Sequence, residues 1–330
     1  MRFPRWASVL TSTLALTSVA SLTACSSDDA THSASAGPDG AFPATVEHKF
    51  GSTTIESRPD RVVTVGFNDL DFALALGEAP VATRAFTGYD YKQRPWAQGY
   101  ATDIPEVGGM ELDVEKVAEA DPDVLLGTYA VFTQDDYDTL SGLAPTVGDV
   151  RGPADGRAAS WEDQLDAIGK ALGKQGEAEK VRDQVRAAFG AATAANPQFA
   201  GRTAAVAMVL DNGFYILEPE DPRAAFFTTL GFTAPAETGT VSPERLDLLD
   251  QRTLIVLGAT KEKLASDPVF SQLPVVKEDR TVYLGEFGTD ATAALGFASP
   301  LSQPYLLDAA TPALSAATDD DPATVVPAVG

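Results

Sequence analysis

Segments with strand character alternate with segments of helical character along most of this chain. In the first half, strands are predicted at 58–66, 79–86, 121–129 and 145–150, and helices at 70–77, 113–120 and 133–144. In the second half, strands are predicted at 203–210, 214–217, 252–258 and 281–285, and helices at 223–231, 242–250, 260–273 and from 291 onward. Such alternation requires parallel strand pairing with helices on both faces, so the sequence predicts an α/β fold.

One stretch without strand character separates the two halves. Between residues 161 and 197, apolar side chains recur at spacings of three and four until Pro197 stops the pattern. We expect one long or once-broken helix there, joining two Rossmann-like lobes with parallel central sheets. The predicted lobes are 45–160 and 198–318, followed by a flexible acidic tail at 319–330.

A short pattern occurs once in each half. An acid at a helix start is followed six positions later by Asp, then by an apolar strand and a glycine. The two sets are Glu115, Asp121 and Gly127, and Glu244, Asp250 and Gly258. A carboxylate at a helix start is favoured by the helix dipole, which would explain each glutamate alone. Recurrence at the same place in both halves indicates a matched pair of surface acids, suited to a symmetric basic partner.

The N-terminus has the layout of a secretory leader. Residues 1–24 begin with Arg2 and Arg5 and continue through an uncharged stretch that ends in small residues. Leu22–Cys25 look like the lipobox of bacterial lipoproteins, so we expect lipidation at Cys25 and an extracytoplasmic, membrane-anchored protein, with 25–44 as a flexible tether. Cys25 is the only cysteine, which excludes an internal disulfide.

The acidic composition limits the partners. The formal net charge is −23, and removal of Arg2 and Arg5 with the leader would bring it to −25. Nucleic acid and anionic lipid would be repelled, whereas a basic protein partner would be attracted.

In the order of these motifs, the chain resembles the iron-siderophore solute-binding lipoproteins of ABC importers. The resemblance rests on 58–86, 114–129, the helical stretch 161–197 and 242–258, and it extends over residues 45–315. It implies a monomer that captures a ferric siderophore in a shallow cleft between lobes joined by a rigid helix. It also implies delivery to membrane permease subunits, which would be met by Glu115 and Glu244. No cofactor would be bound directly, because iron would be carried as the ferric siderophore.

Loop positions nominate the residues that would face the cleft, since ligands of open parallel sheets bind beyond the carboxyl ends of strands. The expected ligand-binding residues are Arg84, Tyr89, Tyr91, Trp96, Tyr129, Phe132, Phe214, Tyr215, Arg223 and Phe287, with Arg94 and Arg151 as weaker candidates. Tyr and Trp offer flat surface with a hydrogen-bonding edge, and Arg would hold catecholate or carboxylate oxygens.

Other ligands and other functions were weighed against the siderophore. Haem or cobalamin could be gripped by the same aromatic side chains. Free divalent metal is disfavoured, because the only histidines, His32 and His48, lie far from the expected cleft loops.

An enzyme is the rival class of protein. The acidic pairs Asp69 with Asp71 and Asp135 with Asp136 could serve a secreted carboxylate-dependent hydrolase, although they look like solvated helix and loop charges. No serine-hydrolase, P-loop or dinucleotide motif is present, so we expect a protein that is not an enzyme. A purely structural surface protein would explain neither the loop aromatics nor the matched glutamates.

Overall fold

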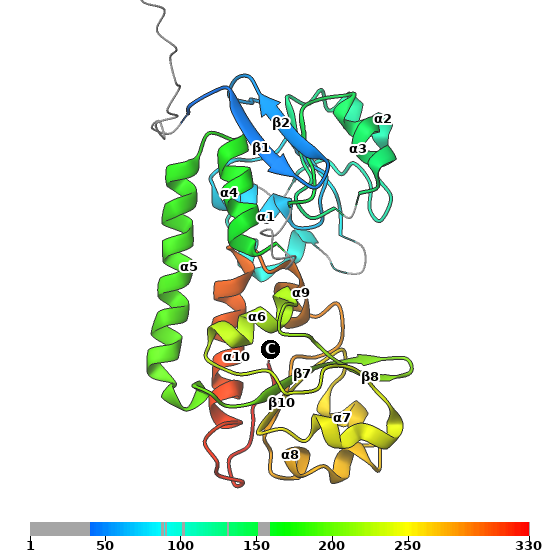
Figure 1. The fold of residues 1–330 in the computed structure, drawn as a ribbon, viewed down its shortest axis with the longest axis vertical. Coiled ribbons are helices and arrows are strands. Elements are labelled where there is room, and N and C mark those ends of the chain that lie inside the picture. The colour runs from blue at the N-terminus through cyan, green and yellow to red at the C-terminus, as the bar shows by residue number, and fades with distance from the viewer. Residues whose placement is uncertain are drawn as a thin grey trace, which may run out of the picture. The chain divides into compact units, whose positions relative to one another are not determined.

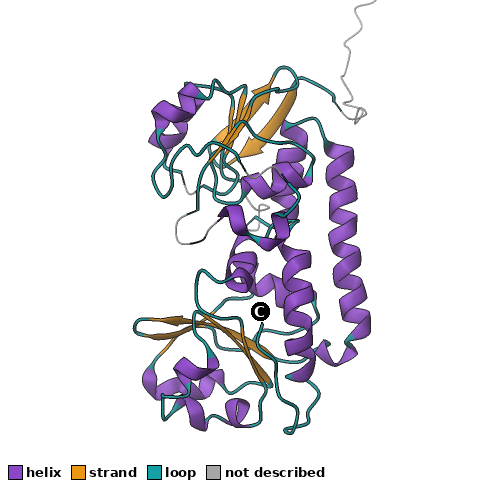
Figure 2. Ribbon diagram, turned by 180° about the vertical axis from the view of Figure 1, so that it is seen from behind, coloured by secondary structure: helices purple, strands orange, loops and turns teal. Residues whose placement is uncertain are grey.

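Two β-sheets flanked by helices make up the fold of this chain in a computed structural model (Figures 1 and 2). The structure describes residues 40–86, 89, 91–100, 103–130, 132–150 and 159–329. The leader, Cys25, most of the predicted tether and Arg151 therefore lie outside the described residues. In the part that is described, no helix combines the length and the apolar character needed to cross a membrane.

The first sheet is parallel throughout, in the order β4-β3-β5-β6, as the alternation predicted. Every residue of its strands is buried, which is typical of a parallel sheet that is covered on both faces. The strands are β3 (Val62–Thr64), β4 (Ala82–Thr83), β5 (Val124–Leu126) and β6 (Thr146–Val147). We call the part of the chain built on this sheet the first lobe.

An antiparallel hairpin that the sequence did not predict precedes this sheet. It consists of β1 (Ala44–His48) and β2 (Gly51–Ile55). In β1 every second residue is buried, the period expected when one face of a strand packs on a core. His48, the one described histidine, is buried and its Nε2 lies 2.9 Å from Thr53 Oγ1, so it serves the packing of this hairpin.

The helices of the first lobe begin at side-chain caps where the sequence offers them. Asp113 caps α2 by accepting a hydrogen bond from Lys116 N, and Thr133 with Asp136 forms a capping box at α3. The helices are α1 (Asp69–Ala75), α2 (Val114–Glu119) and α3 (Gln134–Ser141), with short 3₁₀ turns η1 (Tyr91–Gln93) and η2 (Pro95–Ala97).

The connecting segment is broken once. Helix α4 (Trp161–Ala171) ends before Gly173, whose φ of +65° lies in the left-handed region, and α5 (Gln175–Ala195) begins after it. Helix α4 packs on α1 and β1 in the first lobe, and α5 packs along α4 and α10 (Figure 1). The connection between the two sheets is therefore the 21 residues of α5 and not the whole of 161–197.

The second sheet is mixed, in the order β11-β10-β7-β8-β9. Its strands β7, β10 and β11 are parallel as predicted, but β8 is antiparallel to β7 and β9 is antiparallel to β8. Only Asp211 and Asn212 separate β7 from β8, and so short a loop permits only an antiparallel hairpin. The strands are β7 (Ala204–Leu210), β8 (Gly213–Ile216), β9 (Gly239–Val241), β10 (Thr253–Leu257) and β11 (Thr281–Tyr283).

Helices lie on both sides of the second sheet (Figure 2), and we call this part of the chain the second lobe. Residues 242–250, predicted as an α-helix, form a 3₁₀ segment with a kink at Arg245, and 260–273 divides into two short elements. The helices are η3 (Pro197–Phe199), α6 (Pro222–Thr229), η4 (Pro243–Leu249), α7 (Lys261–Leu264), η5 (Phe270–Gln272), α8 (Pro274–Lys277), α9 (Asp290–Phe297) and α10 (Ser302–Ala316).

The largest hydrophobic cluster spans both lobes. It joins Leu70 and Leu74 of α1 and Trp96 of η2 to Phe297 of α9 and Leu306 of α10. Because apolar side chains of the two lobes exclude water from one another, separating the lobes would expose a shared core. This packing resists opening.

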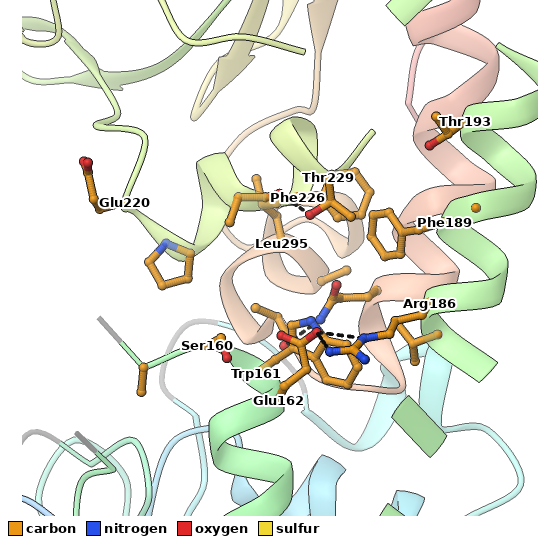
Figure 3. A pocket seen from close by; sticks show the side chains of 18 of the residues that line it. Ser160, Trp161, Glu162, Arg186, Phe189, Thr193, Glu220, Phe226, Thr229 and Leu295 are labelled. Atoms are coloured by element: carbon orange, nitrogen blue, oxygen red, sulfur yellow. Dashed lines mark hydrogen bonds and ion pairs between the residues drawn. The ribbon is translucent and has the colours of Figure 1, made fainter. Parts of the chain in front are cut away.

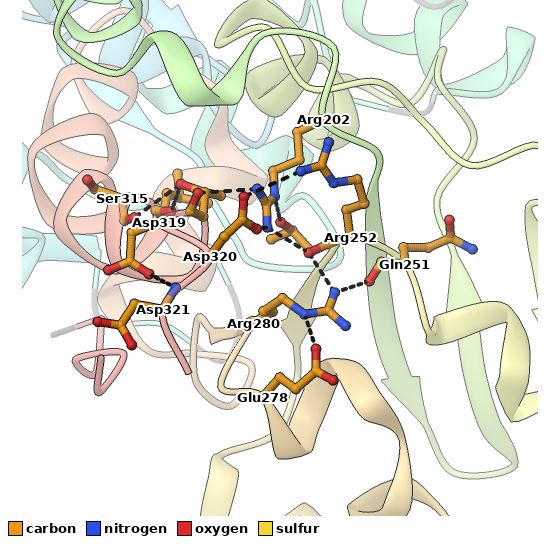
Figure 4. Close-up of polar contacts among 12 residues, drawn as sticks. Arg202, Gln251, Arg252, Glu278, Arg280, Ser315, Asp319, Asp320 and Asp321 are labelled. Atoms are coloured by element: carbon orange, nitrogen blue, oxygen red, sulfur yellow. Dashed lines mark hydrogen bonds and ion pairs between the residues drawn. The ribbon is translucent and has the colours of Figure 1, made fainter. Parts of the chain in front are cut away.

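Residues 319–330 were predicted to be a flexible tail, but Asp320 and Val326 are bonded to the second lobe (Figure 4 shows Asp320). Asp320 accepts a hydrogen bond of 2.6 Å from Arg202, whose side chain is buried and also donates to the carbonyl of Thr318. Further along, Val326 N donates to Asp279. The acidic residues of this segment suggested a tail, but one of them, Asp320, is the hydrogen-bond partner of the buried Arg202.

Candidate ligand-binding surface

Aromatic side chains gather where the strands of the first sheet end. Phe67 follows β3, Phe86 follows β4 and Tyr129 follows β5. Ring centroids lie 5.9 Å apart between Phe67 and Phe86 and 6.3 Å apart between Phe67 and Tyr129, while Phe86 reaches Phe297 of the second lobe at 5.1 Å. We call Phe297, Phe86, Phe67 and Tyr129 the aromatic row.

Parts of this row are open to solvent. Phe86 is 37% exposed and Tyr129 is 49% exposed, and the neighbouring segment carries Met110 at 63%. Large apolar side chains gathered in this way at strand ends offer flat surface to a ligand. Tyr129 was predicted from the sequence; Phe67 was not, although its position directly after a buried strand could have indicated it.

Arg84, the leading ligand contact predicted from the sequence, lies beneath the aromatic row. Its guanidinium lies 4.0 Å from the centroid of the Phe67 ring. Its nitrogens donate to the carbonyls of Val65, Gly109 and Met110 at 3.2, 2.7 and 2.5 Å. Burial lowers the pKa of Arg84. The side chain therefore supports Phe67 and the loop at 109–110, and direct contact with a ligand stays a prediction.

Three predicted ligand contacts are core residues instead. Trp96 is buried and donates from Nε1 to Asp71 at 2.7 Å. Phe132 is buried in the first lobe, and Phe214 is buried in the second lobe, where it stacks on Phe270 at 5.4 Å. The prediction that these side chains face a ligand was wrong, because apolar surface from other segments covers each of them.

Two further tyrosines of the loop after β4 were predicted as ligand contacts. Tyr89 donates from its hydroxyl to Asp290 of α9 at 2.7 Å and stacks on Trp96, so it joins the two lobes. Burial, followed by this hydrogen bond, raises the pKa of Tyr89. The backbone of Tyr91 lies in η1, and its side chain lies outside the described residues.

The second lobe contributes Arg223 at the start of α6. Its Nε and Nη2 donate to both oxygens of Asp221 at 2.9 and 2.6 Å, and its Nη1 lies 3.0 Å from Met208 Sδ. The hydrogen bond to Asp221 is the main reason that the pKa of Arg223 is raised, and Tyr129 of the first lobe adds to the effect. Tyr129 and Arg223 were both predicted from the sequence as ligand contacts, and that role stays a prediction for each.

Tyr215 and Phe287 complete the predicted residues of the second lobe. The Tyr215 hydroxyl donates to Glu218 at 2.7 Å. Phe287 is 56% exposed, and its ring lies against Gly258, whose φ is +90°. A side chain at Gly258 would collide with that ring, so this glycine allows Phe287 to lie against the end of β10.

The buried acids of α1 were not recognised as buried from the sequence. Asp69 and Asp71 both have an exposed fraction of 0%, which corrects the interpretation that they are solvated charges. Asp71 accepts hydrogen bonds from Arg94 Nε at 2.8 Å and from Ser299 Oγ of the second lobe at 2.8 Å, in addition to Trp96. Arg94 is therefore part of the lobe interface. Acids within an otherwise apolar helical run were the signal available for this.

Asp69 has a different environment from Asp71. One of its oxygens accepts from the backbone and the hydroxyl of Thr128, and the other, Oδ2, has no hydrogen-bond partner and lies against Gly66. Burial raises the pKa of Asp69 to about 6, although the bonds from Thr128 oppose the shift. Because both carboxylates of this pair are enclosed, neither can meet a substrate and a water as a hydrolase would require.

A cavity of about 520 Å³ lies on another side of α6 (Figure 3). Phe189 of α5, Phe226 of α6 and Leu295 of α9 supply apolar wall, and the ion pair of Glu162 with Arg186, at 3.2 Å, lies at one end. The α6 residues that line it are spaced by three and four, whereas Arg223 is absent from the lining. The cavity is thus distinct from the aromatic row.

Glu115 and Glu244, the acids of the repeated pattern, are both exposed. Glu115 lies in the first turn of α2 and Glu244 in the first turn of η4. Both are accessible to a protein partner, and their role in docking stays a prediction. Among the described residues, no group of three or more His, Cys, Asp or Glu is placed to hold a metal ion.

Two α/β lobes connected by a helix, with exposed aromatic side chains at the strand ends of one lobe, are the architecture of a solute-binding protein. The model of the periplasmic binding protein family matches residues 62–286, and the chain belongs to that family. The family and the α/β fold class predicted from the sequence are thereby confirmed.

Individual relatives agree with this family. A periplasmic solute-binding protein of Mycobacterium smegmatis is 31% identical with a TM-score of 0.73, covering 82% of this chain and 97% of the other. PiaA of Streptococcus pneumoniae in complex with ferrichrome is 25% identical with a TM-score of 0.69, covering 84% and 99%.

A curated relative matches over a shorter span. The ferric-anguibactin-binding protein FatB of Vibrio anguillarum is 34% identical over 111 residues. That match covers 32% of this chain and only 31% of the Vibrio protein. These relatives are binding proteins, and those whose ligands are named bind iron chelates.

Proposed function

We propose that this chain is the extracytoplasmic solute-binding component of an ABC importer and that it captures a ferric siderophore between its lobes. The observation that carries the proposal is the aromatic row, which lies at the ends of β3, β4 and β5 and reaches Phe297 of the second lobe. A large chelate needs flat contact surface from both lobes, and this arrangement offers it. Ferric-anguibactin and ferrichrome, named for FatB and PiaA, are ligands of the proposed class.

The residues proposed to contact the ligand follow from the described geometry. They are Phe67, Phe86, Tyr129, Tyr215, Arg223 and Phe287, with Arg84 supporting Phe67 from below. The first two were added by the structure, and the others were predicted from the sequence. Trp96, Phe132 and Phe214 are left out because they are buried.

Delivery requires attachment to the membrane and contact with a permease. We propose that a lipid on Cys25 anchors the protein, that the segment between Cys25 and β1 acts as the tether, and that Glu115 and Glu244 contact the permease subunits. Energy for transport would come from a separate ATPase. The protein itself would capture and deliver.

Titration of the purified mature chain with iron chelates tests the proposal. Ferric hydroxamates, ferric catecholates, ferric citrate, haem and cobalamin are each titrated by isothermal calorimetry. Tight binding of at least one ferric siderophore is expected, with a Kd below about 1 µM. Replacing Phe86 by Ala should weaken that binding, whereas replacing the exposed Val269 by Ala, far along the chain in the second lobe, should not. If no ferric siderophore gave a binding signal in the calorimeter, the proposal would be refuted.

A further inference from the structure

The charge balance at the proposed binding surface indicates which chelates it accepts. Among the described residues, Arg84 and Arg223, the two arginines proposed to support or contact the ligand, are both engaged within the protein. The guanidinium nitrogens of Arg84 donate hydrogen bonds to the carbonyls of Val65, Gly109 and Met110. Arg223 forms a two-pronged ion pair with Asp221. A guanidinium used in this way has little capacity left for the oxygens of an anionic ligand.

Acidic groups accompany each of these cations. Asp69 lies close enough to Arg84 to influence its pKa, and Asp221 directly offsets the charge of Arg223. Glu218 stands beside them on Tyr215. Near Phe287, Lys263 pairs with Glu286 at 3.4 Å, so this lysine is offset too.

The balance among the described residues is therefore neutral to negative, within a chain whose formal net charge is −23. A strongly anionic chelate placed here would meet like charge, which nearby apolar walls make less screened than in bulk water. The apolar part of the proposed binding surface consists of aromatic rings, because Phe86, Tyr129 and Phe287 are each more than a third exposed. Apolar walls and offset cations suit a ligand with an apolar shell and no excess negative charge.

We propose that the ligand is an electroneutral or weakly cationic ferric chelate, of the kind formed by three hydroxamate groups, and that Asp221 enforces this choice by neutralising Arg223. The inference rests on the proposed function and narrows it. Three monoanionic hydroxamates balance the three positive charges of ferric iron, whereas three dianionic catecholates leave an excess of three negative charges. The geometry disfavours the second kind of complex, because no described arginine at the surface is left to balance that excess.

Charge preference is measured with chelates of matched size. Calorimetric titrations of the mature chain use a neutral ferric trihydroxamate and a ferric tricatecholate, each at about 0.05 and about 0.5 M NaCl. We expect the trihydroxamate to bind about 100-fold more tightly, with a Kd that changes less than about twofold with salt, because an uncharged ligand is not screened. Tighter binding of the tricatecholate would overturn this inference and leave the proposed function intact. Absence of binding by any ferric chelate would refute both.

The role of Asp221 is tested by Asp221→Asn, with Asp308→Asn on the exposed face of α10 as the matched control. Releasing the Arg223 guanidinium should shift the ratio of the two affinities about tenfold toward the tricatecholate. The control should leave the ratio unchanged. Far-ultraviolet circular dichroism confirms that each variant is folded. A folded Asp221→Asn protein with the wild-type ratio would show that Asp221 does not set the preference.

Discussion

Asp69 and Asp71, in the first turn of α1, show how the surroundings of a buried carboxylate determine its ionisation. Asp69 and Asp71 are both fully buried, but of the two only Asp71 forms an ion pair, with Arg94, and it has Trp96 and Ser299 as further donors. Asp69 has Thr128 on one oxygen and no hydrogen-bond partner on the other. Burial without an ion pair penalises the charged form, so the two carboxylates should respond differently to pH and to substitution.

Asp69 should make the protein less stable as the pH rises through its own titration. Its pKa is raised from 3.8 to about 6 in the folded chain, so between these values the folded state holds the proton more tightly than the unfolded state. Protonated Asp69 contributes up to about 3 kcal/mol to the free energy of unfolding. This contribution is fully present below about pH 4 and is lost as the pH rises through about 6. Urea unfolding of wild type and Asp69→Asn at pH 4, 5, 6 and 7 measures it. Their difference in unfolding free energy should change with pH, and parallel profiles would contradict the assignment.

Asp71 should be costly to remove. Asp71→Ala leaves the guanidinium of Arg94, which is 2% exposed, without its carboxylate, and we expect a loss of about 3–5 kcal/mol in the free energy of unfolding. The exposed pair of Arg245 with Asp247 provides the comparison, because Asp247→Ala should cost far less than Asp71→Ala. Equal losses of unfolding free energy for the two substitutions would mean that burial does not make the Asp71–Arg94 pair more important for stability.

At the scale of elements, the break between α4 and α5 sets the course of the connecting helix. The apolar spacing of 161–197 is helical on both sides of the break, so the pattern left open whether the helix is continuous. Gly173 decides it, because its left-handed conformation ends α4 and redirects the chain into α5. Its Cα is also close to Phe42, where an added Cβ would come within 2.8 Å of the ring.

Two glycine substitutions should therefore act in opposite directions. Gly173→Ala forces a side chain into a left-handed conformation and against Phe42, and should cost about 1–2 kcal/mol. Gly190→Ala lies within α5 with no atom within 4 Å of the added carbon, and should stabilise by about 0.5–1 kcal/mol. Thermal and urea unfolding of both variants distinguish the two sites. A stabilised Gly173→Ala protein would show that the break tolerates an ordinary residue.

At the scale of the whole molecule, the shared core and the polar links across the lobes restrain their relative motion. Trp96 and Phe297 lie in one cluster, Asp71 meets Ser299, and Asn68 Nδ2 donates to the carbonyl of Phe297 at 2.9 Å. Wide opening would break all of these contacts at once. We therefore expect capture with a small hinge movement, which would keep the exposed acids on the two lobes at a nearly constant spacing.

Permease docking should depend on both of those acids. The double substitution Glu115→Ala with Glu244→Ala should lower cellular uptake of the ferric chelate by at least about tenfold and leave the Kd of the purified chain unchanged, because both side chains are exposed and neither is among the proposed ligand contacts. Glu179→Ala with Asp308→Ala removes the same charge from exposed positions on α5 and α10. Equal loss of uptake in both double variants would mean that net charge, and not these two sites, governs docking.

The sequence by itself determined the α/β class and the order of most strands and helices. These follow from local spacing, which acts within a few residues. It also predicted Tyr129 as a ligand contact from its position just after a parallel strand, and that role stays a prediction.

Only the tertiary structure decided which side chains of those loops remain open to a ligand. Trp96 occupies a polar loop in the sequence but is enclosed by Asp71 and by Phe297, which is about two hundred residues away along the chain. The hydrogen bond between Ser299 and Asp71 spans 228 positions. Burial and ion pairing depend on such distant partners, and local spacing carries no information about them, so the exposure of an aromatic ring and the balance of a buried charge are properties of the folded chain.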